Sequence, residues 1–374
     1  MTFTLPNAPI GYAWEATSEA VAARYGLPVE SIARFDLNTV TQPPEIAERA
    51  VRSGRYEVPI SEYPPSDYRR LVDAAAARYG CEPSELLVGA GADEILDLLG
   101  KAFIPPGGRA IVPTPSYAMF TVVTAQRGAT VVAVPRRSAA EGFALDNPAI
   151  RAAAAAPGGA DLIWLCNPNN PTALLEPEGS IERLLDDLAH DADAAGRPAP
   201  VVALDEAYAE FVDASLAGLR FRYPRLVIVR TLSKAYALAG LRVGFALARP
   251  DLIAAITPYR PPGSVSVVSL AAGEAVLLED SVAPATVARI AVERERFAGW
   301  LTGAGWSVLP SRTNFLLVDF GTPDRAAAIA EGLLRRGLVP RTFPADHPLA
   351  AYLRLTVRDR EQDDRLVAAA RELG

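Results

Sequence analysis

The chain has 374 residues and half of them are apolar, which is enough for a large core divided between two domains. Acidic and basic residues are interspersed and sum to a net charge of −7, so neither nucleic acid nor a membrane surface is an expected partner. Two cysteines and two histidines, all far apart, provide no disulfide framework and no metal site. The sequence has no apolar run of the ~20 residues that a membrane span needs. It also shows no signal-peptide pattern, so a cytoplasmic enzyme is expected.

Residues 1–44 are predicted to form an N-terminal arm that packs with a small domain and the substrate site. One short amphipathic helix is expected at residues 20–25, where Gly26 ends it. The stretch 36–44, DLNTVTQPP, is polar and irregular. Such a stretch either links two elements or lines a site.

Residues 45–258 are predicted to form a large cofactor-binding domain. After two helices, strands are expected at 86–88, 110–113, 130–134, 161–166, 201–205, 226–229 and 244–247, with helices between most of them. This alternation indicates the α/β class, with a mostly parallel seven-stranded sheet sandwiched by helices. Ligands of such sheets bind beyond the carboxyl ends of the strands, and the polar clusters of this chain fall at those ends.

Residues 259–374 are predicted to form a smaller α+β domain. A long helical stretch is expected at 265–301, with an interruption near Pro284. Strands are expected at 306–309, 315–319 and 352–357, with a helix at 326–336 and another at the C-terminus.

A glycine-rich turn follows the first predicted strand of the large domain. Gly91, Ala92 and Asp93 open a helix there, so unpaired main-chain N–H groups are available to a phosphate. A nicotinamide cofactor would need a third glycine and a later acidic residue, and neither is clear. That alternative also leaves the lysine and the aspartate described next without a role.

Lys234 is one of only two lysines, in a chain that uses arginine almost everywhere else. A lysine, unlike an arginine, becomes a neutral nucleophile when its surroundings lower its pKa. Lys234 follows the apolar strand 226–229, which makes it a Schiff-base candidate. Asp205 ends another buried strand, where a carboxylate needs a partner such as a pyridinium nitrogen.

Further polar and aromatic residues stand at other strand ends. Tyr208 and Asn170 could hold a ring oxygen, and Tyr117 offers a face on which a ring stacks. Donors for a phosphate are Thr231, Ser233 and Arg242. Each has an ordinary reading as a turn, a cap or a surface residue, but together, in this order, they indicate one cofactor site.

The chain resembles the fold-type I aminotransferases that depend on pyridoxal 5′-phosphate, and the histidinol-phosphate aminotransferase subfamily most. The matching segments are GADEILDLL, PTPSYAMF, CNPNNPT, DEAYAEF, RTLSKAYALAGLRVGFALA, TNFLLVDF and YLRLTV. The resemblance implies that Lys234 forms the Schiff base and then moves the α-proton, and that Asp205 pairs with the ring nitrogen. It gives Tyr208, Asn170 and Tyr117 the ring contacts named above.

The same resemblance implies the remaining contacts of the cofactor. Gly91, Ala92, Asp93, Thr231, Ser233 and Arg242 would surround its phosphate. Tyr63 would reach the phosphate of a neighbouring subunit, which implies a homodimer with shared active sites. The amino group would move from the donor to a 2-oxo acid, usually 2-oxoglutarate.

The substrate contacts follow by resemblance as well. Arg354 matches the arginine that grips an α-carboxylate, and Arg341 matches one near a substrate phosphate. Tyr12 matches an N-terminal tyrosine of the subfamily. Asn38 begins a segment, Asn38-Thr39-Val40, that lacks the acidic residue usual in the subfamily. Histidinol phosphate is the lead donor on this basis, and the amino donor is left open.

Three alternatives remain at this point. One is an aminotransferase for aromatic or other amino acids in a biosynthetic side pathway. Another is a decarboxylase of the threonine-phosphate type with the same cofactor. A third is a non-catalytic binding domain on the same fold, although Lys234, Asp205, Tyr208 and Arg354 are all intact.

Overall fold

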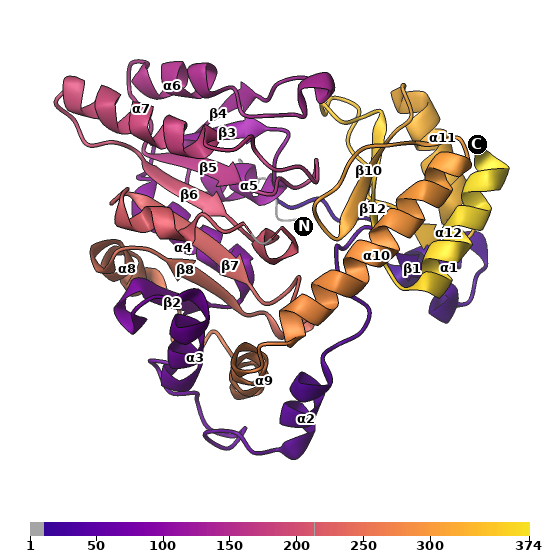
Figure 1. Ribbon diagram of the computed structural model, residues 1–374, viewed down its shortest axis with the longest axis horizontal. Coiled ribbons are helices and arrows are strands. Elements are labelled where there is room, and N and C mark those ends of the chain that lie inside the picture. The colour runs from indigo at the N-terminus through magenta and orange to yellow at the C-terminus, as the bar shows by residue number, and fades with distance from the viewer. Residues whose placement is uncertain (1–10, 213) are drawn as a thin grey trace, which may run out of the picture.

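A computed structural model describes residues 11–212 and 214–374 and contains a seven-stranded sheet at its centre (Figure 1). Its strand order is β2-β8-β7-β6-β5-β3-β4. The strands are β2 (Leu86–Gly89), β3 (Arg109–Thr114), β4 (Thr130–Pro135), β5 (Leu162–Cys166), β6 (Val201–Asp205), β7 (Leu226–Thr231) and β8 (Gly244–Leu247). Only β8 runs antiparallel to its two neighbours. The predicted α/β class and mostly parallel sheet are therefore confirmed.

Helices cover both faces of this sheet, which explains why its central strands are apolar along most of their length. Alternate residues of β5 point to opposite faces, so Trp164 packs in one core cluster and Leu165 in the other. One face is covered by α4 (Gly91–Phe103), α5 (Ala118–Gln126) and α8 (Pro250–Ile256). The other is covered by α3 (Arg69–Tyr79), α6 (Asn147–Ala155), α7 (Ser180–Ala194) and α9 (Val267–Leu278).

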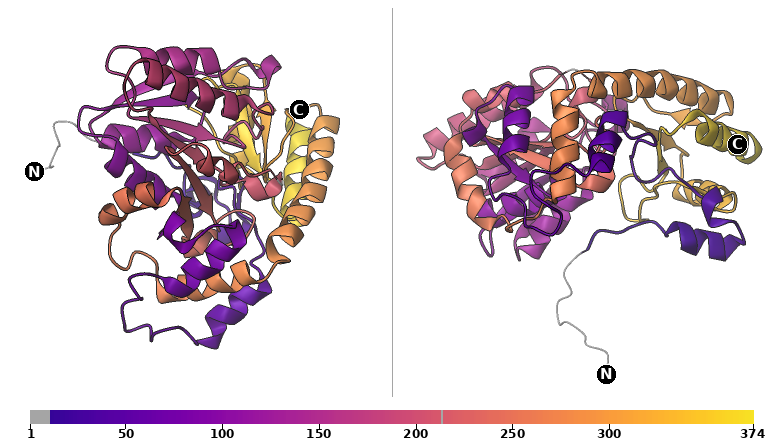
Figure 2. Two further views of the ribbon diagram at one scale, coloured as in Figure 1. Left: turned by 60° about the vertical axis from the view of Figure 1, so that its left-hand side comes forward. Right: turned by 90° about the horizontal axis from the view of Figure 1, so that it is seen from below.

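A smaller part lies beside the large sheet and contains the C-terminal elements (Figures 1 and 2). Its three-stranded sheet has the order β12-β10-β9, formed by Tyr352–Thr356, Phe315–Asp319 and Ser307–Val308. Its helices are α10 (Val282–Gly303), α11 (Pro323–Leu334) and α12 (Arg360–Leu373).

The arm joins this smaller part. Its helix α1 (Ser18–Tyr25) is confirmed, and the segment then runs into β1 (Ala33–Arg34). This strand pairs in parallel with β11 (Leu338–Val339), a contact that the sequence did not predict. The chain next crosses to α2 (Glu45–Ser53), which packs against α9. The stretch 36–44 therefore runs between the two parts of the molecule.

Some predicted boundaries were wrong. The interruption predicted in the helical stretch 265–301 is present, but it lies at residues 279–281, between α9 and α10. Pro284 itself is in the first turn of α10, where no main-chain N–H is needed. Strand β7 continues to Thr231, two residues beyond the predicted end. The limits at residues 44 and 258 stay predictions.

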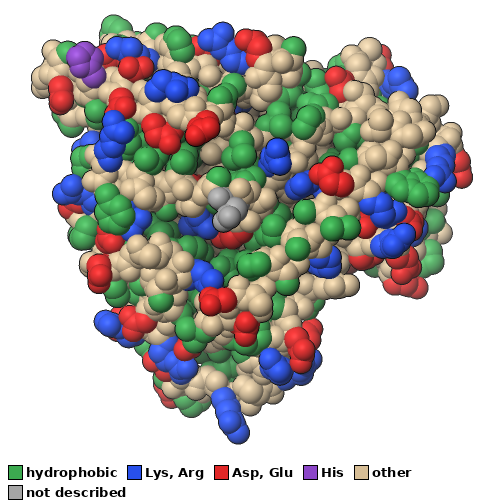
Figure 3. All heavy atoms as spheres, in the orientation of Figure 1, with side chains coloured by type: hydrophobic (Ala, Val, Ile, Leu, Met, Phe, Trp, Pro, Cys, Tyr) green, Lys and Arg blue, Asp and Glu red, His purple; other side chains and the backbone are tan. Residues whose placement is uncertain are grey.

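The first ten residues, on which the expectation of no signal peptide largely rests, lie outside the described part of the chain. Within residues 11–212 and 214–374, no helix is both long and apolar enough to cross a membrane. On the face shown in Figure 3, positive and negative side chains are mixed, and neither sign forms a large continuous area.

Candidate active site

A cavity of about 650 Å³ opens between the carboxyl ends of the large sheet and the smaller part. It is lined by Tyr12, Trp14, Asp36, Leu37, Asn38, Thr39, Ala92, Asp93, Tyr117, Met119, Asn170, Asp205, Ala207, Tyr208, Thr231, Ser233, Lys234, Ala239, Arg242, Arg341 and Arg354. The polar clusters that the sequence placed at separate strand ends thus meet in one site.

Lys234 projects into this cavity three residues after β7. Its Nζ donates a hydrogen bond to the main-chain oxygen of Asn38, over 3.3 Å, and lies 5.7 Å from the centre of the Tyr208 ring. Burial, followed by the positive charge of Arg354, lowers the pKa of Lys234 to about 8. A substantial fraction of the amine is therefore neutral near physiological pH, as a nucleophile or a base requires.

Asp205 ends β6 and is almost fully buried. One of its oxygens accepts a hydrogen bond from the main-chain N–H of Ala207, over 2.9 Å. Burial nevertheless raises the pKa of the Asp205 carboxyl to about 7. A cation placed against it would hold it ionised, and a protonated ring nitrogen is such a cation.

The first turn of α4 and strand β8 approach each other closely at two glycines. Gly91 has a φ of +81°, and a Cβ there would lie 2.5 Å from Nη2 of Arg242. A Cβ on Gly244 would lie 2.4 Å from the main-chain carbon of Gly91. Both glycines are therefore required for the helix N-terminus to sit against the strand. Ala92 and Asp93 of this first turn line the cavity. N–H groups in the first turn of a helix have no partner within the helix, so they suit an anion.

Hydroxyl and guanidinium donors lie beside this turn. Thr231 Oγ1 donates to Ser233 Oγ over 2.9 Å, and Arg242 Nη2 forms a 3.0 Å ion pair with Asp93. Tyr117 Oη also donates to Asp93, over 2.8 Å. Burial and the Asp93 carboxylate raise the pKa of Tyr117 well above its usual value. The Tyr117 phenol thus stays neutral, with its ring along the cavity wall.

Arg354 enters the cavity from β12 and is buried. Its Nη1 donates to Oδ1 of Asn170 over 2.7 Å, and its Nη2 donates to the main-chain oxygen of Asp36. Its Nε has no hydrogen-bond partner within the described residues. A buried cation held only by neutral oxygens is costly, so this position favours an anionic ligand.

The structure brings all but two of the predicted site residues to the lining of one cavity. Gly91 lies directly behind it, in contact with Arg242. The other residue outside the lining is Tyr63, which is 90% exposed. The contact predicted for Tyr63 is therefore not made within one chain.

Several lining residues were not predicted from the sequence, among them Trp14, Asp36, Leu37 and Met119. Asn314 was also missed, although its Nδ2 donates to the main-chain oxygen of Asn38 over 2.9 Å. Trp14, Asp36 and Leu37 lie in none of the matching segments, whereas Met119 and Asn314 lie in PTPSYAMF and TNFLLVDF, where neither was assigned a role. Only the polar composition of residues 36–44 indicated that this stretch could line a site.

The residues present fit a cofactor with a phosphate and a cationic aromatic ring. The helix N-terminus, hydroxyls and Arg242 suit the phosphate, and the buried Asp205 suits the ring. Within the described residues, no group of three or more His, Cys, Asp or Glu side chains is placed to hold a metal ion.

Comparison with known proteins, by sequence and by structure, finds similarity to histidinol-phosphate aminotransferases. A histidinol-phosphate aminotransferase of Roseiflexus castenholzii is 37% identical over 363 residues, covering 95% of this chain and 93% of the relative. One of Xylella fastidiosa (strain 9a5c) is 39% identical over 323 residues, or 84% of each chain. The crystal structure of histidinol-phosphate aminotransferase from Sinorhizobium meliloti in complex with pyridoxal 5′-phosphate has a TM-score of 0.85 and 26% identity, covering 97% of this chain and 95% of that one.

The fold defines the class, and the partly buried lysine that shares a cavity with an aspartate agrees with it: the architecture is that of the fold-type I transferases that use pyridoxal phosphate. The family model for aminotransferase class I and II matches residues 32–369, and the chain belongs to this family. The resemblance found in the sequence and the predicted enzyme class are thereby confirmed.

Proposed function

We propose that the protein is a pyridoxal 5′-phosphate-dependent aminotransferase that moves an amino group from histidinol phosphate to a 2-oxo acid, with 2-oxoglutarate the expected acceptor. The observation that carries the reaction type is Lys234: a partly buried amine with a lowered pKa, in the same cavity as Asp205 and the first turn of α4. The names of the relatives, at 34–39% identity over most of the chain, support the donor.

When bound, pyridoxal phosphate supplies an electron sink for the pair left behind when the donor loses its Cα proton. Nζ of Lys234 takes that proton from Cα and later returns one, which its pKa of about 8 allows. The Asp205 carboxylate would keep the ring nitrogen protonated, and Tyr208 and Asn170 would orient the ring oxygen. Tyr117 limits movement of the ring by packing along the cavity wall.

The substrate side of the cavity contains two arginines. Arg354 and Arg341 both line it, together with Tyr12 and Trp14 from the arm. Two cations suit a donor with a phosphate and an acceptor with two carboxylates, which use the same cavity in turn. The aromatic residues suit the imidazole ring of the donor.

An aminotransferase for aromatic amino acids is the second candidate, because Thr39 lines the cavity where the subfamily usually has an acid. The decarboxylase and binding-domain alternatives gain no such support. A cytoplasmic location remains a prediction.

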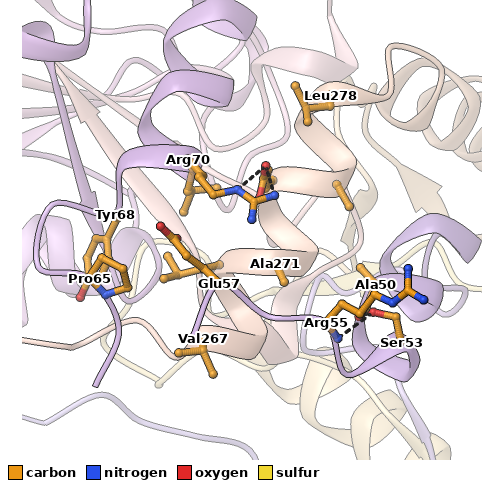
Figure 4. A pocket seen from close by; sticks show the side chains of 14 residues that line it. Ala50, Ser53, Arg55, Glu57, Pro65, Tyr68, Arg70, Val267, Ala271 and Leu278 are labelled. Carbon is orange, nitrogen blue, oxygen red and sulfur yellow. Dashed lines mark hydrogen bonds and ion pairs between the residues drawn. The ribbon is translucent and has the colours of Figure 1, made fainter. Parts of the chain in front are cut away.

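We also propose a homodimer in which Tyr63 of one chain reaches the cofactor phosphate of the other. Tyr63 lies in an irregular segment between α2 and α3 that also exposes Ile60. This segment borders a second cavity, of about 270 Å³, formed with α9 (Figure 4). Leu278, at the rim of that cavity, is 65% exposed. A second copy would cover these apolar side chains and complete the phosphate site.

The function is tested by half-reactions with the holoenzyme. Histidinol phosphate, phenylalanine, tyrosine, threonine phosphate and glutamate are each added without an acceptor, and the visible absorbance of the bound cofactor is followed. Conversion is expected with histidinol phosphate and glutamate. Conversion by phenylalanine or tyrosine but not by histidinol phosphate would favour the second candidate, and release of CO2 from threonine phosphate would favour the decarboxylase.

A further inference from the structure

Glu15 stands on the arm, close to the cavity but outside its lining. Its Oε1 accepts hydrogen bonds from the main-chain N–H and the Oγ1 of Thr342, over 2.7 and 2.8 Å. The same oxygen lies 3.8 Å from Nη1 of Arg341, which also donates to the main-chain oxygen of Ala13 over 2.7 Å. The arm therefore supplies Arg341 with a carboxylate while the guanidinium still lines the cavity.

The second arginine of the cavity, Arg354, forms no ion pair with a carboxylate of the described part of the chain. Arg341 and Arg354 are neighbours, since their main chains exchange two hydrogen bonds of 3.0 Å. Within residues 11–212 and 214–374, the guanidinium of Arg354 donates hydrogen bonds to two neutral oxygens, those of the Asn170 side chain and the Asp36 main chain, and it lies over the Phe315 ring. The pKa of Arg354 is lowered first by burial and also by the charge of Arg341. An anion held between the two arginines thus meets the uncompensated charge of Arg354 and the charge of Arg341, which Glu15 partly neutralises.

We propose that Glu15 is a specificity-determining residue that lowers the affinity of the Arg341 side of the cavity for a dianionic phosphate group more than for a singly charged carboxylate group. This inference rests on the proposed function, because it assumes that substrate anions are held between Arg341 and Arg354. A fixed negative charge behind Arg341 repels a phosphate dianion about twice as strongly as a carboxylate at the same distance.

The charge of Glu15 matters because the donor and the acceptor use the same cavity in two successive half-reactions. A phosphate-bearing donor held by two fully available arginines would compete strongly with an acceptor that carries only carboxylates. By weakening phosphate binding more than carboxylate binding, Glu15 makes the affinities of the cavity for the donor and the acceptor more alike. Both substrates can then occupy the cavity in turn. The position of Glu15 outside the lining fits this role, because it acts on Arg341 without touching the substrate.

The test measures binding of inorganic phosphate and of acetate to the holoenzyme by titration calorimetry at low ionic strength. In Glu15→Gln the amide oxygen still accepts from Thr342, and only the charge is lost. We expect the Kd for phosphate to fall about fivefold and that for acetate to fall about twofold. This increase in anion affinity in Glu15→Gln should become smaller when the salt concentration is raised to about 0.5 M. Glu30→Gln, which removes the charge of an exposed acid elsewhere on the arm, should change neither Kd.

A purely structural role of Glu15, in which only its hydrogen bonds to Thr342 matter, predicts a different pattern of phosphate affinities. Thr342→Val removes one hydrogen bond to Glu15 and leaves its charge, so phosphate affinity should stay within about twofold of wild type. Unchanged or weaker phosphate binding in Glu15→Gln, an equal gain in Glu30→Gln, or no phosphate binding by any of these proteins would overturn the inference. The donor is tested separately: failure of histidinol phosphate in the half-reaction, with the Glu15 effect on phosphate present, would reject only the proposed donor.

Discussion

Nδ2 of Asn38 donates a 2.9 Å hydrogen bond to the phenol oxygen of Tyr208, which joins the arm to the loop after β6. The main-chain oxygen of Asn38 accepts from Lys234 Nζ and from Asn314 Nδ2. Asn38 has a φ of +54°, a left-handed conformation that asparagine adopts more readily than most residues. One arm residue thus connects the reactive lysine with both parts of the molecule.

Asn38→Ala should lower both activity and stability. It removes the hydrogen bond to Tyr208 and places a less suitable residue at a positive φ, at a cost of about 1–2 kcal/mol in the free energy of unfolding. We expect kcat to fall about tenfold, because Tyr208 loses its orientation. Asn38→Gly relieves the backbone strain only, so it should regain part of the stability but not the activity. Wild-type kcat in both variants would show that the amide has no role.

Gly244→Ala should weaken cofactor binding. The added methyl group would lie 2.4 Å from the main chain of Gly91, so the N-terminus of α4 must move away from β8. A shift of this kind disrupts the phosphate contacts, and we expect the Kd for pyridoxal phosphate to rise at least tenfold, or about 1.4 kcal/mol. Gly240→Ala is the matched control, since a Cβ there meets no atom within 4 Å. Equal affinities in the two variants would contradict the proposed phosphate site.

The cofactor-free protein should become less stable as the pH rises towards neutrality, because of Asp205. Its pKa is about 7 in the folded protein and near 3.8 in the unfolded chain. Between these values the unfolded state binds fewer protons, so Asp205 lowers the free energy of unfolding by up to about 1.4 kcal/mol per pH unit. Denaturant titrations of the cofactor-free protein at about pH 5, 6 and 7 measure this slope. Asp205→Asn should remove that part of the slope, and an identical pH profile in the variant would refute the assignment.

The sheet and the cofactor side of the site were predictable because their signals are local. The strand that precedes Lys234 is a continuous apolar run, and parallel strands bring their carboxyl ends to one edge. This is why Asp205 and Lys234, 29 positions apart in the chain, could be assigned to one site before the structure was known.

The substrate side depends on contacts between distant segments, which no local pattern encodes. Strand β1 pairs with β11 across about 300 residues, and this pairing brings the arm beside Arg341. Trp14 and Glu15 therefore acquire their roles only in the folded chain. The exposure of Tyr63 is what a contact with another chain would require, and that contact stays a prediction.

The central claim, that Lys234 is the residue that reacts with the cofactor and moves the proton, is tested most directly by comparing Lys234→Ala with Lys101→Ala. Lys101 is the only other lysine and forms an ion pair with Asp97 on α4. The measurement is the rate of a single half-reaction with histidinol phosphate or glutamate after incubation with pyridoxal phosphate, followed by the change in cofactor absorbance. We expect Lys234→Ala to lose about 10⁴-fold or more in rate, as is typical when a nucleophile is removed, and Lys101→Ala to match the wild type. A Lys234→Ala protein that converts either donor at the wild-type rate would contradict this account.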